Sequence, residues 1–280
     1  MSEFILTFSC DDRPGLVHAV TRWLVDQQCN ILDSAQFRDD LSLRFFMRVH
    51  FEGAADLHSL QQTYQKIGDG NQMAWQISPV SVPARVLILV SRVDHCLTDL
   101  LYRRRIGELK IDVPLVCSNH RDAYPLVAAE DIDYLHLPMT ADNKAEQESR
   151  LLKEIEARQI DFLVLARYMQ ILSPEFCEQF PGRIINIHHS FLPGFKGARP
   201  YHQAHLRGVK LIGATAHYVT ADLDEGPIIE QDVERVDHRM GAQQLAAVGR
   251  DIERVVLAKA VRYQAEHRIL QNGDRTVVFN

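Results

Sequence analysis

The chain has 280 residues and a formal net charge of −6, and 46% of its residues are apolar. This apolar content excludes a disordered chain, and the acidic balance argues against a general nucleic-acid-binding protein. The longest aliphatic run, residues 86–90, is far shorter than the roughly 20 residues of a membrane-spanning helix. Five scattered cysteines without a C-x-x-C pair, together with a start that lacks signal-peptide features, predict free thiols in a reducing, cytoplasmic setting.

Residues 1–80 have the pattern of a small α/β unit. Apolar residues recur at helical spacing from Leu16 to Leu24, and before them Asp12 is expected to cap the helix and Pro14 to lie near its first turn. The expected elements are a strand at 4–9, a helix ending near 28, strands at 31–38 and 43–51, a helix at 56–67 and a strand at 73–78. This βαββαβ order predicts a ferredoxin-like sandwich.

Residues 81–84 are expected to link this unit to a second domain, residues 85–280, with a different pattern. Continuous apolar strands at 86–90, 114–117, 134–137, 162–166 and 184–187 alternate with helical segments at 98–105, 122–129, 144–158 and 174–180. Such βα repetition predicts a doubly wound, mostly parallel sheet. Strands at 211–219 and 228–236, a helix at 243–266 and a short apolar tail are expected to follow.

Ligands of open α/β sheets bind beyond the carboxyl ends of the strands, where Asn186 and His188 stand two residues apart. Side chains at this spacing point the same way from a strand. A carboxamide and an imidazole can both donate to a developing oxyanion, and the imidazole can also move protons. The alternative is that His188 only forms a structural hydrogen bond at the end of the strand. The tight turn expected at Pro193-Gly194 favours a functional site over this alternative.

Two further segments carry polar or ligand-facing groups. Asp224 lies in an acidic turn that contains glycine, where a carboxylate could favour the charged form of His188 or hold a water; an ordinary acidic hairpin is the alternative. The apolar loop at 169–172 could present backbone groups to a flat heteroaromatic ring, or could be tucked into the core.

Metal and cofactor motifs are missing from the sequence. His188-His189 and His202-x-x-His205 lack strong zinc spacing, and there is no H-E-x-x-H. Neither glycine-rich phosphate motif occurs, nor does the G-x-S-x-G of a serine hydrolase. We therefore expect no metal and no cofactor.

Together, these segments resemble the folate-dependent formyltransferase family over about residues 84–280. The motif N-I-H-x-S-x-L-P-x-F-x-G begins at Asn186 and ends at Gly197, and an H…D-x-G segment follows from His217 to Gly226. The resemblance implies a folate substrate and catalytic roles for Asn186, His188 and Asp224. It implies that the substrate is bound by Met169, Gln170, Ile171, Leu172, His217 and Asp222.

The motif D-R-P-G-L-V-x-x-V, from Asp12 to Val20, resembles an ACT domain. The resemblance implies control by an amino acid, with glycine or methionine as the expected effectors, or a dimerisation module without a ligand. A ligand site would be lined by Asp12, Gly15, Leu16, Asn30 and Ile31. Because edge strands of such domains often pair across subunits, we expect a homo-oligomer.

The segment after the first strand of the second domain separates two activities within the formyltransferase family. Glycinamide ribonucleotide formyltransferase has a glycine-rich phosphate loop there, whereas residues 90–100 contain no glycine. His189 stands where that enzyme has proline. With the ACT segment, the resemblance therefore implies hydrolysis of 10-formyltetrahydrofolate to formate and tetrahydrofolate, which would supply formate for purine synthesis and balance one-carbon pools. Transfer to an amine such as glycinamide ribonucleotide, and a regulatory protein that binds folate without turnover, are the alternatives.

Overall fold

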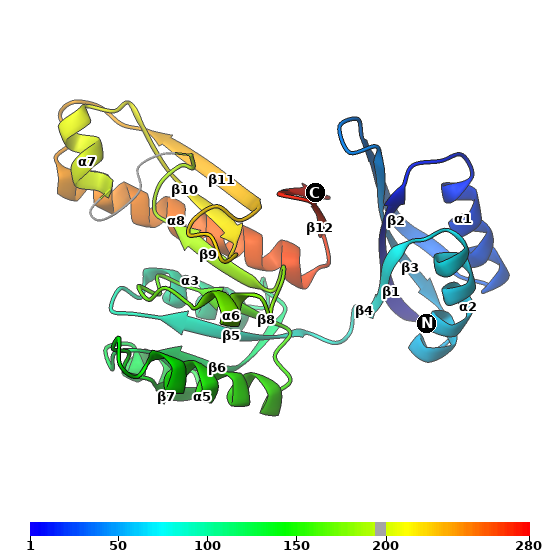
Figure 1. Ribbon diagram of the computed structural model, residues 1–280, viewed down its shortest axis with the longest axis horizontal. Coiled ribbons are helices and arrows are strands. Elements are labelled where there is room, and N and C mark those ends of the chain that lie inside the picture. The colour runs from blue at the N-terminus through cyan, green and yellow to red at the C-terminus, as the bar shows by residue number, and fades with distance from the viewer. Residues whose placement is uncertain (194–199) are drawn as a thin grey trace. The chain divides into compact units, whose positions relative to one another are not determined.

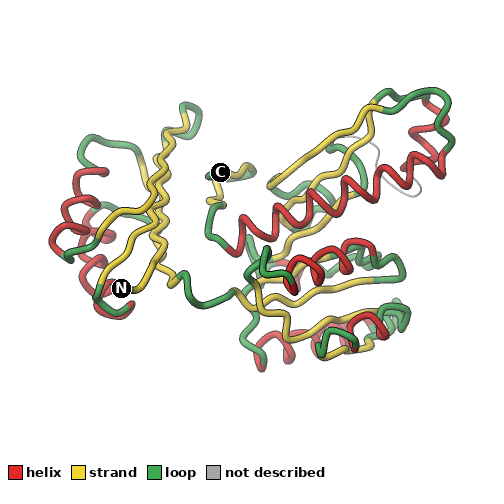
Figure 2. Tube along the Cα trace, turned by 180° about the vertical axis from the view of Figure 1, so that it is seen from behind, coloured by secondary structure: helices red, strands yellow, loops and turns green. Residues whose placement is uncertain are grey.

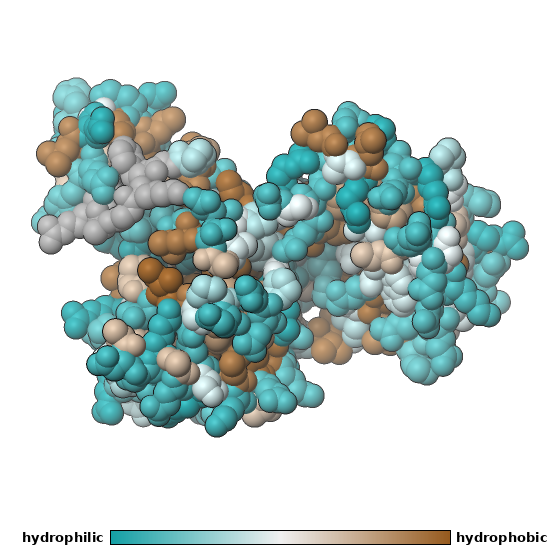
Figure 3. Space-filling view, in the orientation of Figure 1, coloured by the Kyte–Doolittle hydropathy of each residue, from teal (hydrophilic) through white to brown (hydrophobic). Residues whose placement is uncertain are grey.

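The computed structural model describes residues 1–193 and 200–280 (Figure 1). Backbone contacts divide the chain into two units, one comprising Met1–Pro83 with Glu266–Asn280 and the other Ala84–Ala265. The C-terminal segment therefore groups with the first unit, whereas the sequence analysis had assigned it to the second. Figure 3 shows mostly hydrophilic residues on the visible face of each unit.

The first unit has the expected βαββαβ order. An antiparallel sheet, in the order β2-β3-β1-β4, carries two helices on one face (Figure 2). Leu6 and Phe8 of the sheet are buried against Trp23 and Tyr64 of the two helices because they alternate onto the covered face. The elements are β1 (Ser2–Asp11), α1 (Leu16–Asp26), β2 (Asn30–Asp39), β3 (Arg44–Gly53), α2 (Leu57–Gly70) and β4 (Ala74–Pro79).

The start of α1 differs from the expected cap. Gly15 is the N-cap residue and has φ +94°, a left-handed conformation that glycine adopts without steric cost, and no side chain caps the helix. Asp12 instead accepts a hydrogen bond from Nε of Arg38 at 2.8 Å. The prediction that Asp12 caps this helix is wrong because its carboxylate is paired with β2.

The C-terminal residues form a β-ribbon, so the expected apolar tail is also wrong. Its strands are β12 (Ile269–Asn272) and β13 (Arg275–Val278). Asn272 Nδ2 and Arg275 Nη2 donate to the same oxygen of Asp39 at 2.9 and 2.7 Å. Hydrogen bonds from Ser42, Asn272 and Arg275 hold the pKa of Asp39 well below its usual range. This ionised carboxylate explains why the ribbon belongs to the first unit.

The second unit is built on a mostly parallel sheet, as predicted. Its strands lie in the order β11-β10-β9-β8-β5-β6-β7 in the described part of the chain, and β5 to β9 are parallel to one another. β10 is antiparallel to both β9 and β11. The strands are β5 (Ala84–Val90), β6 (Ile111–Ser118), β7 (Asp133–His136), β8 (Phe162–Leu165), β9 (Ile184–His188), β10 (Leu211–Tyr218) and β11 (Ile228–Arg235).

Helices cover both faces of this sheet. Leu87 and Leu89 of β5 share a core with Leu151 of α5 and Phe176 of α6. Their neighbours Val86, Ile88 and Val90 point the other way and are also buried, and α8 packs against β9, β10 and α3. The helices are α3 (His95–Arg105), α4 (Tyr124–Ala128), α5 (Lys144–Ala157), α6 (Pro174–Cys177), α7 (Pro200–Arg207) and α8 (Ala242–Ala265). No sequence pattern predicted α7. Among the described helices, none is long and apolar enough to cross a membrane.

Candidate active site

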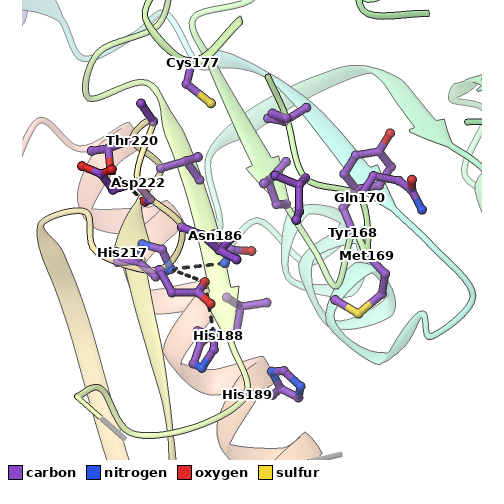
Figure 4. Close-up of a pocket in the computed structure, with 18 residues that line it drawn as sticks. Tyr168, Met169, Gln170, Cys177, Asn186, His188, His189, His217, Thr220 and Asp222 are labelled. Carbon is purple, nitrogen blue, oxygen red and sulfur yellow. Dashed lines mark hydrogen bonds and ion pairs between the residues drawn. The ribbon is translucent and has the colours of Figure 1, made fainter. Parts of the chain in front are cut away.

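A pocket in the second unit brings three loops together. They are the segment after β8, the end of β9 and the turn between β10 and β11 (Figure 4). Because β8 and β9 are parallel neighbours, their carboxyl ends meet at one edge of the sheet. The predicted catalytic and substrate-binding residues that line this pocket are Met169, Gln170, Ile171, Leu172, Asn186, His188, His217, Asp222 and Asp224.

Asp224 joins the polar side chains at the centre of the pocket. Its Oδ1 lies 3.2 Å from Nδ1 of His188 and 3.7 Å from Nε2 of His217. Asn186 Nδ2 lies 3.2 Å from the same nitrogen of His217, whose Nδ1 donates to the carbonyl of Tyr218 at 2.8 Å. The hydrogen bonds from His188 and His217 hold the pKa of Asp224 well below its usual range. The pocket therefore contains a carboxylate that stays ionised beside two imidazoles.

His188 lines the pocket, and one of its ring nitrogens has no partner within this group. The residue is 4% exposed, and its Nε2 is buried without a hydrogen-bond partner among the described residues. A buried polar nitrogen normally has a partner, so an unpartnered one beside a pocket marks a place for a ligand atom. With Nδ1 directed to Asp224, a His188 ring that carries both protons can donate its Nε2–H to an oxygen that becomes negative.

The turn that carries Asp224 depends on its backbone. Asp224 itself has φ +57°, a conformation that costs energy for a residue other than glycine and often occurs at functional sites. A Cβ added at Gly226 would lie 1.9 Å from the carbonyl oxygen of Tyr218, so this position requires glycine. Both residues fold the turn back towards β9, and the ordinary acidic hairpin is therefore not the structure observed.

The apolar loop after β8 exposes two of its side chains at the pocket. Met169 is 54% exposed and Ile171 64% exposed, whereas Leu172 packs in the core as well as lining the pocket. Exposed apolar side chains around a concave site are suited to the faces of a flat ring. Ser91 anchors the loop, because its Oγ accepts from the backbone N–H of Met169 at 2.9 Å and donates to Asn119 at 2.7 Å.

Replacing Ser91 with alanine is expected to lower the free energy of unfolding of the second unit by about 1–3 kcal/mol. Ser91 is 3% exposed, so the change leaves the part-buried backbone N–H of Met169 and the buried side-chain oxygen of Asn119 without a partner. Urea denaturation followed by circular dichroism measures the loss. Ser91→Thr keeps the hydroxyl and is the matched control; an alanine variant as stable as wild type would contradict the anchoring role.

Several residues near the pocket had no role in the sequence analysis. His189 lines it, and its position directly after His188 was the available signal. Behind it, Glu253 of α8 accepts hydrogen bonds from Tyr201 at 2.6 Å and His95 at 2.8 Å, and lies 3.5 Å from Arg167. Glu253 and its three partners come from four separate segments, so no local pattern could reveal the cluster.

The same cluster holds the described group with metal-ligand atoms, His95, Cys96 and Glu253. Arg167 places a positive charge beside the carboxylate, and burial raises the pKa of the Cys96 thiol well above its usual value. Both effects disfavour a cation, because the metal would need an available carboxylate and a thiolate. The chemistry of these side chains therefore fits an ion-pair cluster and not a metal site.

The five predicted effector-site residues lie at the start of α1 and on β2. Leu16 is 3% exposed and belongs to the core, and Asn30 donates to Glu52 at 3.3 Å. Ile31 is 39% exposed, while Asp12 and Gly15 have the positions given above. A ligand site among these residues stays a prediction. Gly194, Phe195 and Gly197 of the motif that begins at Asn186 lie outside the described residues.

Comparisons with known proteins cover both units. Residues 84–261 match the formyl transferase family model and residues 4–69 the ACT domain model. A formyltetrahydrofolate deformylase of Bacillus subtilis is 47% identical over 279 residues, which are 98% of this chain and 93% of that protein. The crystal structure of a formyltetrahydrofolate deformylase from Burkholderia mallei matches all of both chains at 51% identity and a TM-score of 0.97. Glycinamide ribonucleotide transformylase 1 from Symbiobacterium toebii matches 71% of this chain and 95% of its own at 32% identity and a TM-score of 0.66.

Proposed function

Because the chain belongs to the formyltetrahydrofolate deformylases, a family that joins an ACT domain to a formyl transferase domain, we propose that its pocket hydrolyses 10-formyltetrahydrofolate to formate and tetrahydrofolate. One observation carries the proposal: Asn186, His188 and Asp224 meet in a single pocket beside an exposed apolar loop. The pterin ring would lie against that loop, with Met169 and Ile171 on its faces.

The chemistry follows from the polar group at the pocket centre. Water adds its oxygen to the formyl carbon and gives up a proton to a base in the pocket, and the electron pair of the C=O bond moves to the carbonyl oxygen. Nε2–H of His188 and the carboxamide of Asn186 donate to this oxyanion. Collapse of the intermediate breaks the C–N bond, its electron pair goes to the folate nitrogen, and His188 is placed to supply the proton that this nitrogen needs.

Asp224 acts in this scheme through His188. A carboxylate that donors hold ionised is a poor proton acceptor, but it stabilises a positive imidazole 3.2 Å away. The sequence left two roles open for Asp224, favouring the charged form of His188 and holding a water, and the geometry supports the first.

Replacing Asp224 with asparagine is expected to reduce kcat by about 10²-fold or more, because the charged His188 loses its counter-ion. The affinity for tetrahydrofolate is expected to change little. Steady-state kinetics and titration calorimetry with tetrahydrofolate measure the two quantities. Asp222→Asn, in the same turn, is the comparison: as a substrate contact it should raise KM and leave kcat near wild type. Equal kcat in the two variants would argue against this role of Asp224.

Formate release without an acceptor tests the function directly. Purified protein is mixed with 10-formyltetrahydrofolate, and formate and tetrahydrofolate are followed together. Stoichiometric release of both supports hydrolysis. Turnover only after addition of glycinamide ribonucleotide would make the protein a transferase, and folate binding without turnover under either condition would favour a regulatory binding protein.

We propose that the reaction needs no cofactor besides the folate substrate, since Asn186, His188 and Asp224 supply donors, acid and counter-charge. Activity that survives dialysis against a chelator would support this. The formate is proposed to enter purine synthesis and to balance one-carbon pools. All five cysteines are unpaired, which supports a cytoplasmic setting.

The ACT domain is proposed to assemble subunits and to bind an amino acid such as glycine or methionine. Its β2 is an edge strand whose side chains are largely exposed, including Leu32 and Phe37 at 44% each. Such an edge favours pairing with a second copy, which supports a homo-oligomer. Sedimentation measures the assembly, and formate release with and without each amino acid measures the regulation.

A further inference from the structure

His189 is a polar side chain of the pocket that the scheme above does not use. Its ring lies 5.2 Å from that of His188 at an interplanar angle of 66°, and it lines the same pocket from the end of β9 (Figure 4). Its two neighbours in the chain are engaged elsewhere: His188 pairs with Asp224, and the carbonyl of Ser190 accepts from Thr215. His189 therefore brings an imidazole without an assigned task to the reaction site.

The other titratable side chains around the pocket are poor acceptors for a proton from water. Asp224 is held ionised by two imidazoles, and His217 uses both ring nitrogens. Burial raises the pKa of Cys177 and Tyr168, so both stay protonated and cannot take up the proton of water. His188 faces Asp224 and serves as donor. Apart from the exposed Asp222, His189 is the remaining titratable group among the described residues of this pocket.

The surroundings of His189 keep its ring neutral. Burial, then Arg167 and His188, lower its pKa to about 4, against smaller opposing effects of Glu253 and Asp224. A neutral imidazole has one nitrogen lone pair that can accept a hydrogen bond. It is also a stronger base than Asp224, whose pKa is lower still.

After burial, the pKa of His189 is lowered most by the positive charge of Arg167, which pairs with Glu253. Arg167 has φ +63°, its guanidinium lies 3.5 Å from Glu253, and its Nε and Nη1 are buried without hydrogen bonds in the described chain. Because Glu253 is itself bonded to His95 and Tyr201, the cluster fixes a positive charge behind His189.

We propose that His189 holds the attacking water in the pocket and accepts its proton as the water adds to the formyl carbon. The inference rests on the proposed hydrolysis and names the group that activates its second substrate. As the O–H bond of water breaks, its proton moves to the free ring nitrogen of His189. The oxygen forms the new C–O bond, and the C=O electron pair moves to the oxyanion facing His188. His189 later returns its proton to solvent.

The test uses His189→Gly in the full-length protein. We expect kcat to fall by about 10²-fold, the usual contribution of a general base. The affinity for tetrahydrofolate is expected to stay within about threefold of wild type, because His189 contacts water and not the folate. Added imidazole is expected to restore kcat in a concentration-dependent way, an effect that a loss of packing would not show. His238→Gly, in an exposed turn, is the control and should match wild type with and without imidazole.

His189→Asn tests the same point if the glycine variant does not fold. Its amide can hold a water but cannot accept a proton, so kcat should still fall by about 10²-fold with tetrahydrofolate binding retained. Wild-type turnover in either folded variant, or a glycine variant that imidazole does not restore, would overturn the proposal. Such a result leaves hydrolysis by the wild-type protein intact, whereas a wild-type protein that releases no formate would refute the proposed function instead.

Discussion

Replacing His188 with alanine is expected to reduce kcat for 10-formyltetrahydrofolate hydrolysis by about 10³-fold, more than any other single change in the pocket. A lost oxyanion donor costs about 10²–10³-fold, and a lost general acid about 10²–10⁴-fold. His188 is placed for both tasks, since its Nε2 is unpartnered in the described chain and Asp224 lies on its other nitrogen. The two losses overlap because one ring performs both.

Steady-state kinetics with tetrahydrofolate binding as a second measurement distinguish lost chemistry from lost structure. Because we propose that the loop after β8 binds the folate, the dissociation constant should change little while kcat falls. His202→Ala, in the exposed part of α7, is the matched control and should retain wild-type turnover. Near-wild-type kcat in a folded His188→Ala protein would refute the mechanism.

The candidate site was predictable where its residues follow short-range rules. Asn186 and His188 share a face because strand side chains alternate, and β9 places both in the pocket. Asp224 was harder, because β10 runs antiparallel to β9 and the turn has to fold back. No short sequence pattern predicts that this turn folds back to β9. The family resemblance predicted the position of Asp224, because its ordered motifs include Asp224 with Asn186 and His188.

Residues that act across long sequence separations were not predictable. The pair of His95 and Glu253 joins positions 158 residues apart, and Asp39 meets Asn272 across 233 residues. The C-terminal ribbon was read as a tail because each of its strands has only four residues. Strands this short depend on tertiary partners, which periodicity does not reveal.

Among the polar clusters described above, we expect disruption of the one around Glu253 to lower the free energy of unfolding most. Replacing Glu253 with alanine should lower the free energy of unfolding by about 3–5 kcal/mol, since removal of one partner leaves another charge buried and uncompensated. The carboxylate is 1% exposed. Its loss leaves His95 and Tyr201 without their shared acceptor and Arg167 without its counter-ion. Asp251→Ala, on the exposed side of α8, is the matched control and should change stability by less than about 0.5 kcal/mol.

The pH dependence of this loss identifies the charge of Glu253 as its cause. Burial raises the pKa of Glu253, but His95, Arg167 and Tyr201 lower it further, so the net pKa is below the usual value. A carboxylate with a depressed folded-state pKa contributes stability above its unfolded pKa of about 4.3, and this contribution disappears as the pH falls through the folded pKa. Urea denaturation at several pH values should therefore show wild type and Glu253→Ala far apart at pH 7 and converging below about pH 4. A difference that does not change with pH would assign the loss to packing, and Arg167 would then need another counter-charge to remain buried behind His189.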